Sequence, residues 1–351
     1  GVGYINFDRG FNTTSYDEIR AAIRELQSQG MTSLVLDLRG NRGGLVDQAQ
    51  KIANIFLYKG QKIVTMRGRP GRFPTREFVA INNEPVDYPL VVLIDRGSAS
   101  ASEILAGALQ DHDRAVIVGE NSFGKGLVQN IFPLTDGSGL TLTTGHYYTP
   151  SGRLLQRDYS GKSFYDYYLK RGDKDAAVQR TEEKRTDSGR TVYGGGGIDP
   201  DVAVKIPAHE AELIRVWIEP VFQFARQLIG GQVPGATEFK VDRSNDHRHR
   251  LAASEYQVSD KVIAAFKNYL REHKELKADE ARVDKDAAWL KRRIRYEVVT
   301  AAYGEEIGRQ VLNEGDVQMQ RAVAELPKAR AIVEEFRRAR VASRGGEASK
   351  N

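Results

Sequence analysis

The strongest constraint on the fold is a series of five short apolar runs in the first 120 residues, each bounded by glycine, proline or charged residues. Runs of this length with such boundaries are typical of buried β-strands. They are GYINF (residues 3–7), SLVLDL (33–38), KIVTM (62–66), PLVVLID (89–95) and RAVIVG (114–119). Helical apolar spacing lies between them, at residues 15–29, 46–58 and 101–110. Because strands that alternate with helices form parallel sheets, we predict an α/β fold with a largely parallel sheet.

Glycine use divides the chain into two regions. Of the 34 glycines, 26 precede Pro207, and the remainder of the chain is rich in alanine, glutamate, arginine, leucine and lysine. We therefore expect a core domain over residues 1–207 and a mainly helical C-terminal domain with a polar tail over 208–351. Within the core, residues 140–153 predict a hairpin and residues 157–197 a polar excursion. Helical spacing in the second region recurs at residues 210–226, 259–272, 284–303 and 317–340.

Charge and composition exclude several classes of function. The chain has 52 basic and 47 acidic residues, a net charge of +5, and both signs are mixed along its length. Such mixing indicates a solvated surface rather than a basic stripe for nucleic acid. The absence of cysteine excludes disulfides, thiolate nucleophiles and Cys-ligated zinc, and no apolar run approaches the length of a membrane span. The six histidines show neither triad nor zinc spacing, so no metal or cofactor is predicted: His112, His146, His209, His247, His249 and His273.

Candidate chemistry lies where the apolar runs end, because the carboxyl ends of parallel strands gather ligand and reaction sites. The first exit, DLRGNRGG, has paired Gly43 and Gly44, which let a backbone N–H approach a substrate. A tight turn without any chemical role explains the same residues. The second exit, GSASASE, enters a helix directly, so the Ser100 hydroxyl lies at the positive end of a helix dipole. Ser100 and Glu103 also fit an S-x-x-E capping box with no chemical task.

The third exit places Lys125 between two glycines, with Phe123, Leu127 and Val128 nearby. Apolar neighbours penalise the charged ammonium group and lower the pKa of a lysine. A neutral lysine can act as a general base. A surface lysine in a glycine turn explains the same residues. The residues alone therefore leave chemistry and structure open at all three exits.

Together these segments resemble the carboxyl-terminal processing proteases, also called tail-specific proteases. The similarity rests on residues 37–45, 98–104 and 124–129, and it extends from about Gly3 to Val204. Further similar stretches are residues 109–111, 119–120, 136–139, 148–152 and 197–202. The resemblance implies a serine endopeptidase with a Ser-Lys dyad on an α/β core related to the ClpP and crotonase fold.

The resemblance assigns Ser100 as the nucleophile and Lys125 as its base, with Gln129 holding the lysine amine in place. The implied oxyanion hole consists of the backbone amides of Gly44 and Ala101, and Glu103 supports the site by capping the helix. Neutral Lys125 would accept the Ser100 proton, and the alkoxide would attack a peptide carbonyl. Water would then release the acyl-enzyme.

The resemblance also gives expectations about partners and location. Expected substrates are proteins or peptides with flexible C-terminal tails, in the bacterial periplasm or cell envelope, without nucleic acid or cofactor. Family members usually carry a PDZ domain upstream, so we expect either a fragment or a protein without that domain. Self-association through the helical C-terminal region and regulation by an adaptor or a PDZ domain stay open. So do two other functions: a catalytically silent peptide-binding scaffold and a crotonase-like acyl-CoA enzyme.

Overall fold

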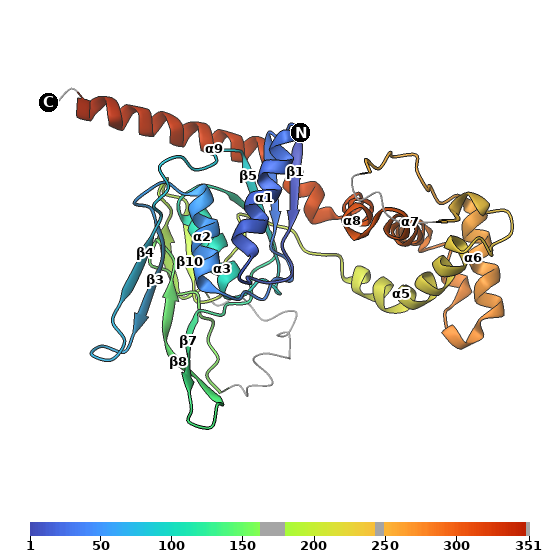
Figure 1. The fold of residues 1–351 in the computed structure, drawn as a ribbon, viewed down its shortest axis with the longest axis horizontal. Helices are drawn as coiled ribbons and strands as arrows, with labels where there is room; N and C mark the ends of the chain where they lie inside the picture. The colour runs from blue at the N-terminus through green and yellow to red at the C-terminus, as the bar shows by residue number, and fades with distance from the viewer. Residues whose placement is uncertain (162–179, 243–248, 349–351) are drawn as a thin grey trace. The chain divides into compact units, whose positions relative to one another are not determined.

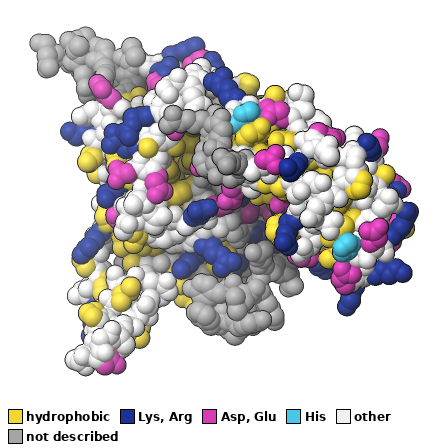
Figure 2. Space-filling model, turned by 45° about the vertical axis from the view of Figure 1, so that its right-hand side comes forward, with side chains coloured by type: hydrophobic (Ala, Val, Ile, Leu, Met, Phe, Trp, Pro, Cys, Tyr) yellow, Lys and Arg dark blue, Asp and Glu magenta, His cyan; other side chains and the backbone are white. Residues whose placement is uncertain are grey.

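The computed structural model describes residues 1–161, 180–242 and 249–348, and Figure 1 shows its elements. The chain divides into two compact units: Gly1–Lys205 together with Arg321–Asn351, and Ile206–Gln320. Basic and acidic side chains are interspersed on the face that Figure 2 shows, as the mixed charge of the sequence predicts. Among the helices of the described ranges, none combines the length and the apolar composition of a membrane span.

A five-stranded parallel sheet forms the centre of the first unit, in the order β1-β2-β5-β6-β11. Its strands are β1 (Val2–Asn6), β2 (Ser33–Asp37), β5 (Leu90–Ile94), β6 (Val116–Gly119) and β11 (Val202–Ala203). The helices that accompany it are α1 (Ser15–Ser28), α2 (Val46–Phe56) and α3 (Ala101–Asp111). Every residue of β2, β5 and β6 is buried, as expected for the central strands of such a sheet. The predicted α/β fold and four of its five strands are confirmed.

The fifth predicted strand belongs to a second, antiparallel sheet. This sheet has the order β4-β3-β8-β7 and consists of β3 (Lys62–Gly68), β4 (Arg76–Val79), β7 (Leu127–Pro133) and β8 (Gly139–Tyr148). A short apolar run carries no information about its partner, so KIVTM could not be told from the parallel strands. The fifth parallel strand is instead β11, which has two residues and gives no periodic signal.

The predicted hairpin at residues 140–153 is partly wrong. Residues up to Tyr148 form one strand, β8, which pairs with β7 around a turn at Gly137. The chain folds back after Tyr148, where a single bridge joins Tyr148 to Leu154. The predicted excursion contains a true hairpin of β9 (Glu182–Arg185) and β10 (Thr191–Gly194). Residues 162–179 of that excursion lie outside the described residues.

The second unit is helical and packs around an aromatic cluster. Its helices are α5 (Ala208–Ile229), α6 (Asp260–Glu272), α7 (Ala287–Tyr303) and α8 (Glu305–Asn313), with 3-10 turns at Thr237–Phe239, Lys274–Leu276 and Glu280–Arg282. The Phe266 ring meets Trp217 and Phe224 edge-on at centroid distances of 6.0 and 5.1 Å. The sequence missed α8, because its buried residues besides a glycine are only Ile307 and Val311. One apolar pair is too short a pattern to predict a helix.

The last helix, α9 (Val317–Ala348), was predicted as part of the helical domain, but from Arg321 onward it groups with the first unit. It buries Ala322, Leu326, Ala329 and Val333, and its Arg337 forms an ion pair with Asp87. Periodicity predicted this helix correctly, but periodicity does not say which core covers its apolar face.

Candidate active site

The turn from β5 into α3 holds Ser100 in a strained backbone conformation. Ser100 is the residue before the helix, and its φ of +57° and ψ of −114° lie where residues other than glycine are rare. An ordinary helix cap adopts an extended conformation instead. A strained serine between a strand and a helix is typical of a nucleophile elbow, which presents the hydroxyl to substrate. The backbone therefore favours a chemical task over capping alone.

The two neighbouring serines have structural hydrogen bonds. The Ser98 hydroxyl donates to the Leu38 carbonyl at 2.8 Å, and the Ser102 hydroxyl donates to the Asn41 carbonyl at 2.9 Å. Both side chains are fully buried. Their hydrogen bonds fasten the loop after β2 to the start of α3. Ser100, in contrast, is only partly buried.

The glycine pair of the first exit packs directly on the Ser100 turn. A Cβ added to Gly43 would lie 2.8 Å from the Ser100 Cβ and 2.9 Å from the Ala101 nitrogen. The Gly43 N–H donates to the Asn41 side chain at 2.9 Å. Within the described ranges, the N–H groups of Gly44 and Ala101 have no hydrogen-bond partner. These are the two amides that the family resemblance assigns to an oxyanion hole.

A single buried carboxylate joins the second and third exits. Glu103 is fully buried, and its Oε2 accepts the N–H of Ser100 and the N–H of Lys125, both at 2.8 Å. The two backbone nitrogens therefore lie within twice that distance of each other. The other oxygen, Oε1, accepts the Gly124 N–H at 2.6 Å and the Ser122 hydroxyl at 2.5 Å. Glu103 thus fixes the predicted nucleophile and the predicted base to one group.

Burial shifts the pKa values of both ionisable residues in this group. The pKa of Glu103 is raised above its usual 4.5 by desolvation, which the hydrogen bonds from Ser122, Lys125, Gly124 and Ser100 oppose. The pKa of Lys125 is lowered from its usual 10.5 by desolvation, and the charge of Glu103 opposes that shift. The direction at Lys125 is the one that a lysine base requires.

The turn that carries Lys125 is held by the segment after β8. The Gly126 N–H donates to the Gln156 side chain at 2.9 Å, and the Arg157 N–H donates to the Gly124 carbonyl at 3.0 Å. The Arg157 guanidinium stacks on the Phe123 ring at 3.9 Å. These contacts leave Lys125 half-buried and give its turn a fixed backbone.

Comparison with known proteins gives the family of this region. The family model described as peptidase family S41 matches residues 1–162. We refer to residues 1–162 as the S41 region. The carboxy-terminal-processing protease of Bartonella bacilliformis is 47% identical over 159 residues, which are 44% of this chain and 36% of that protein. The carboxyl-terminal-processing protease of Synechocystis is 45% identical over 150 residues, 42% of this chain and 34% of that protein.

Among solved structures, the photosystem II D1 C-terminal processing protease is similar, with 31% identity and a TM-score of 0.43 over 61% of this chain and 46% of that chain. The matched part of this chain spans about a third of the length of the two curated relatives.

Gln129 was also predicted as a site residue, but its side chain contacts none of the other predicted site residues through a hydrogen bond. It lies on β7, is exposed, and its side chain makes no hydrogen bond to another described residue. The pairing of β7 with β8 is irregular between Val128 and Gln129. Its action on the lysine amine therefore stays a prediction. In the described ranges, no group of three or more histidines and acidic residues lies close enough together to hold a metal ion.

Three further residues of the first unit position the site and were not assigned from the sequence. Asn41 is fully buried and holds the Gly43 amide, while its own carbonyl accepts the Ala99 N–H at 2.9 Å. Ser122 accepts the Ile198 N–H at 2.7 Å in addition to bonding Glu103. A Cβ on Gly197 would lie 2.5 Å from the Ser122 Oγ, so only glycine fits there. Asn41 and Gly197 lie in stretches that carry the family resemblance, but their residue types alone indicate turns.

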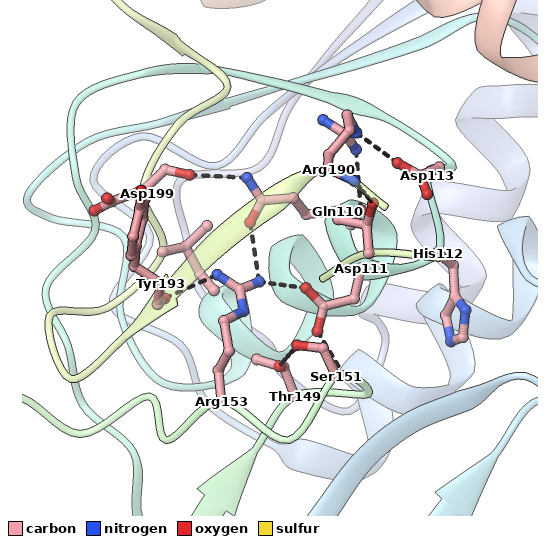
Figure 3. A network of polar contacts seen from close by, with 12 residues as sticks. Gln110, Asp111, His112, Asp113, Thr149, Ser151, Arg153, Arg190, Tyr193 and Asp199 are labelled. Carbon is pink, nitrogen blue, oxygen red and sulfur yellow. Dashed lines mark hydrogen bonds and ion pairs between the residues drawn. The ribbon is translucent and has the colours of Figure 1, made fainter. Parts of the chain in front are cut away.

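The opposite end of α3 is fastened by a buried polar network (Figure 3). Arg153 donates to the Gln110 side chain at 3.0 Å, forms an ion pair with Asp111, and donates to the Tyr193 carbonyl at 3.1 Å. Asp111 also accepts the Ser151 N–H at 2.9 Å. The side chains of Arg153 and Asp111 are each 1% exposed. The similar stretches at residues 109–111 and 148–152 thus serve the scaffold of the S41 region.

Proposed function

We propose that this chain is a serine endopeptidase that cleaves unfolded C-terminal tails of proteins, with Ser100 as nucleophile and Lys125 as base. The observation that carries the proposal is the shared carboxylate: one oxygen of Glu103 accepts the N–H groups of both residues. The strained backbone of Ser100 and the lowered pKa of Lys125 support the same roles. The S41 relatives favour proteolysis over the scaffold and over acyl-CoA chemistry.

The proposed reaction has two halves. Neutral Lys125 takes the proton of the Ser100 hydroxyl as its oxygen attacks the peptide carbonyl, and the N–H groups of Gly44 and Ala101 stabilise the oxyanion. The lysine then gives that proton to the leaving amine, and the peptide C–N bond breaks. In the second half, Lys125 takes a proton from water, the hydroxide attacks the ester, and Ser100 leaves with the proton restored. Gln129 is proposed to orient the amine without adding charge.

The test of the nucleophile is labelling with a fluorophosphonate probe, which phosphonylates activated serines. We expect labelling of the wild type and its loss in Ser100→Ala and in Lys125→Ala. The matched controls are Ser98→Ala and Ser102→Ala, whose hydroxyls have structural bonds and should leave the labelling intact. No labelling of the wild type would favour the scaffold, and labelling that survives in Ser100→Ala would end the assignment.

The substrate is proposed to be an extended tail paired along a sheet edge, with apolar side chains read in a pocket. The measurement appends an apolar disordered tail, a charged disordered tail or no tail to one stable carrier protein. We expect the apolar tail to be cleaved fastest. Equal cleavage of both tails, or faster cleavage of the tail-free carrier, would contradict tail recognition.

The remaining features of the whole protein rest on the family resemblance. We propose a location in the bacterial periplasm or envelope, which cell fractionation tests. The relation of the core to ClpP and crotonase, the involvement of a PDZ domain or adaptor, and self-association through the helical region stay predictions.

A further inference from the structure

A two-stranded arm extends from the antiparallel sheet of the first unit (Figure 1). The strand β8 pairs with β3 only at residues 145–148, so residues 129–133 and 139–143 pair with each other alone. Five paired positions at about 3.4 Å each make an arm roughly 15–20 Å long. Isolated two-stranded hairpins are only marginally stable in water, and they are less stable still when no core covers one of their faces. Within the described residues no further strand pairs with this part of the arm, so a partner that covers one of its faces would stabilise it.

One face of the arm is apolar and exposed. Directly paired residues share a face, so Phe132 and Leu140 point to the same side of the arm. Side chains alternate along each strand, so Leu142 and Leu134, each two residues from one of this pair, lie on that side as well. Their exposures are 37%, 46%, 46% and 48% in that order. Edge strands usually carry lysine or other charges that block unwanted contacts. Here Asp136, at the tip, is the single charged residue between positions 127 and 146.

An arginine-rich turn projects from the same end of the same sheet. The segment RGRPGRFPTR (residues 67–76) comprises the β3–β4 connection and the adjoining strand ends, and it has four arginines and no acidic residue in ten positions. It is adjacent to the base of the arm, because a Cβ on Gly68 would lie 2.4 Å from the Phe73 Cβ and 2.8 Å from the Thr144 carbonyl oxygen. Arg67 stacks on Tyr148 at 4.3 Å. The side chains of Arg69, Arg72 and Arg76 are exposed and, within the described ranges, have no ion-pair partner.

We propose that the arm and the arginine turn together form a docking surface for an anionic lipid membrane. The apolar face of the arm would enter the headgroup boundary, where apolar side chains become buried to a depth of about 5–10 Å. The arginines would lie at the level of the anionic headgroups. Figure 2 shows hydrophobic side chains, without dark blue, on the projection at its lower left that corresponds to the arm. This surface is convex, whereas substrate sites are concave, and a second copy would bring like-charged arginine turns together. Charge and shape thus favour a lipid surface.

The test is vesicle co-sedimentation of the full chain carrying Ser100→Ala, so that it does not depend on proteolysis. The vesicles are phosphatidylcholine alone or mixed with phosphatidylglycerol, at low and high salt. We expect binding to the anionic vesicles that weakens with salt. The arm variant, Leu140→Ser with Leu142→Ser, should lower the partition coefficient on the order of tenfold. The turn variant, Arg69→Ser with Arg72→Ser and Arg76→Ser, should lower the partition coefficient on the order of 10²-fold on anionic vesicles only.

Matched controls exist in the same unit. Ile81→Ser removes a side chain that is 73% exposed at the other end of the same sheet, and Arg20→Ser with Arg24→Ser removes exposed charge from α1. Both should bind as the Ser100→Ala parent does, and thermal melting checks that every variant folds. Three outcomes would overturn the proposal. They are no binding of the parent to anionic vesicles, binding by the arm and turn variants that equals that of the parent, and lipid-free self-association that the arm variant abolishes. Slower tail cleavage in solution by an arm variant of the active chain, with its vesicle binding unchanged, would instead assign the arm to substrate.

Discussion

Replacing Glu103 with glutamine should weaken the fold and the site together. The amide keeps one acceptor oxygen and places a donor NH₂ at the other position. At the Oε2 position that donor would face the N–H groups of Ser100 and Lys125, which would both lose their acceptor. A buried donor without a partner costs about 1–3 kcal/mol. Since the neutral amide also avoids burying a charge, we expect the free energy of unfolding to fall by about 2–4 kcal/mol.

The same substitution should move the pH dependence of activity. The Glu103 charge raises the pKa of Lys125 against the effect of desolvation. Without that charge the lysine loses its proton at lower pH, so the rising limb of kcat/KM should shift to lower pH. The height of the plateau should fall on the order of 10²-fold, because the two catalytic turns lose their shared anchor.

Stability should change with pH in a definite direction. Because burial raises the Glu103 pKa, the folded wild type holds this proton more strongly than the unfolded chain. The stability that the wild type gains over Glu103→Gln from this proton is therefore complete below about pH 4.5. It shrinks as the pH rises toward the pKa of Glu103 in the folded protein. Chemical denaturation across this range measures it.

Glu120→Gln is the matched control for Glu103→Gln. Glu120 lies at the end of β6, near the same site, and its contact with Arg96 is long at 3.9 Å. Its substitution should change stability by less than about 1 kcal/mol. A Glu103→Gln protein as stable as the wild type, or an activity limb displaced to higher pH, would refute the anchoring role.

Three further predictions concern the base, the oxyanion loop and the scaffold. Lys125→Arg should lose as much kcat/KM as Lys125→Ala, because arginine stays charged; wild-type kcat/KM should rise through one ionisation below pH 10.5. Gly44→Ala should lose more stability in thermal melting than Gly40→Ala: both glycines have positive φ, but only at Gly44 would a Cβ lie 2.2 Å from the Phe11 carbonyl oxygen, while Gly40 faces open space. Arg153→Ala should cost about 3–5 kcal/mol by leaving Asp111 buried without its partner. Arg180→Ala, whose ion pair with Asp199 is 57% exposed on the arginine side, should cost about 1 kcal/mol or less.

The sequence predicted the parallel core well because each of its elements has a local signal. Buried strands such as β2 and β5 are continuous apolar runs, and α1 has clear helical spacing. The same logic made Ser100 and Lys125 candidates, since both follow strands of the parallel sheet, and the family resemblance assigned their roles. The element against which a strand or helix packs has no local signal in the sequence and was not predicted. The apolar run of β3 looked like a parallel strand, and α9 gave no sign of the unit that buries it.

The role of Glu103 shows the same limit at the site. The S-x-x-E spacing predicts its hydrogen bond to the Ser100 N–H, because a capping box is local. Its bonds to Ser122, Gly124 and Lys125 join segments about twenty residues apart. That approach depends on β5 pairing with β6, which brings the two exits to one edge of the sheet. The spacing of residues along the chain does not contain this information.

Helix capping and nucleophilic catalysis are therefore not competing explanations for Ser100. The carboxylate that completes the capping box is also the group that holds the Lys125 turn, so the cap positions the proposed nucleophile near its proposed base. All eleven residues of α3 are buried, and its far end is fixed by Arg153. A rigid helix with both ends anchored keeps the strained Ser100 backbone in place without help from substrate. Loosening the Arg153 end should therefore reduce stability and the plateau of kcat/KM, but leave the pH of the activity limb unchanged, because no charge beside Lys125 is altered.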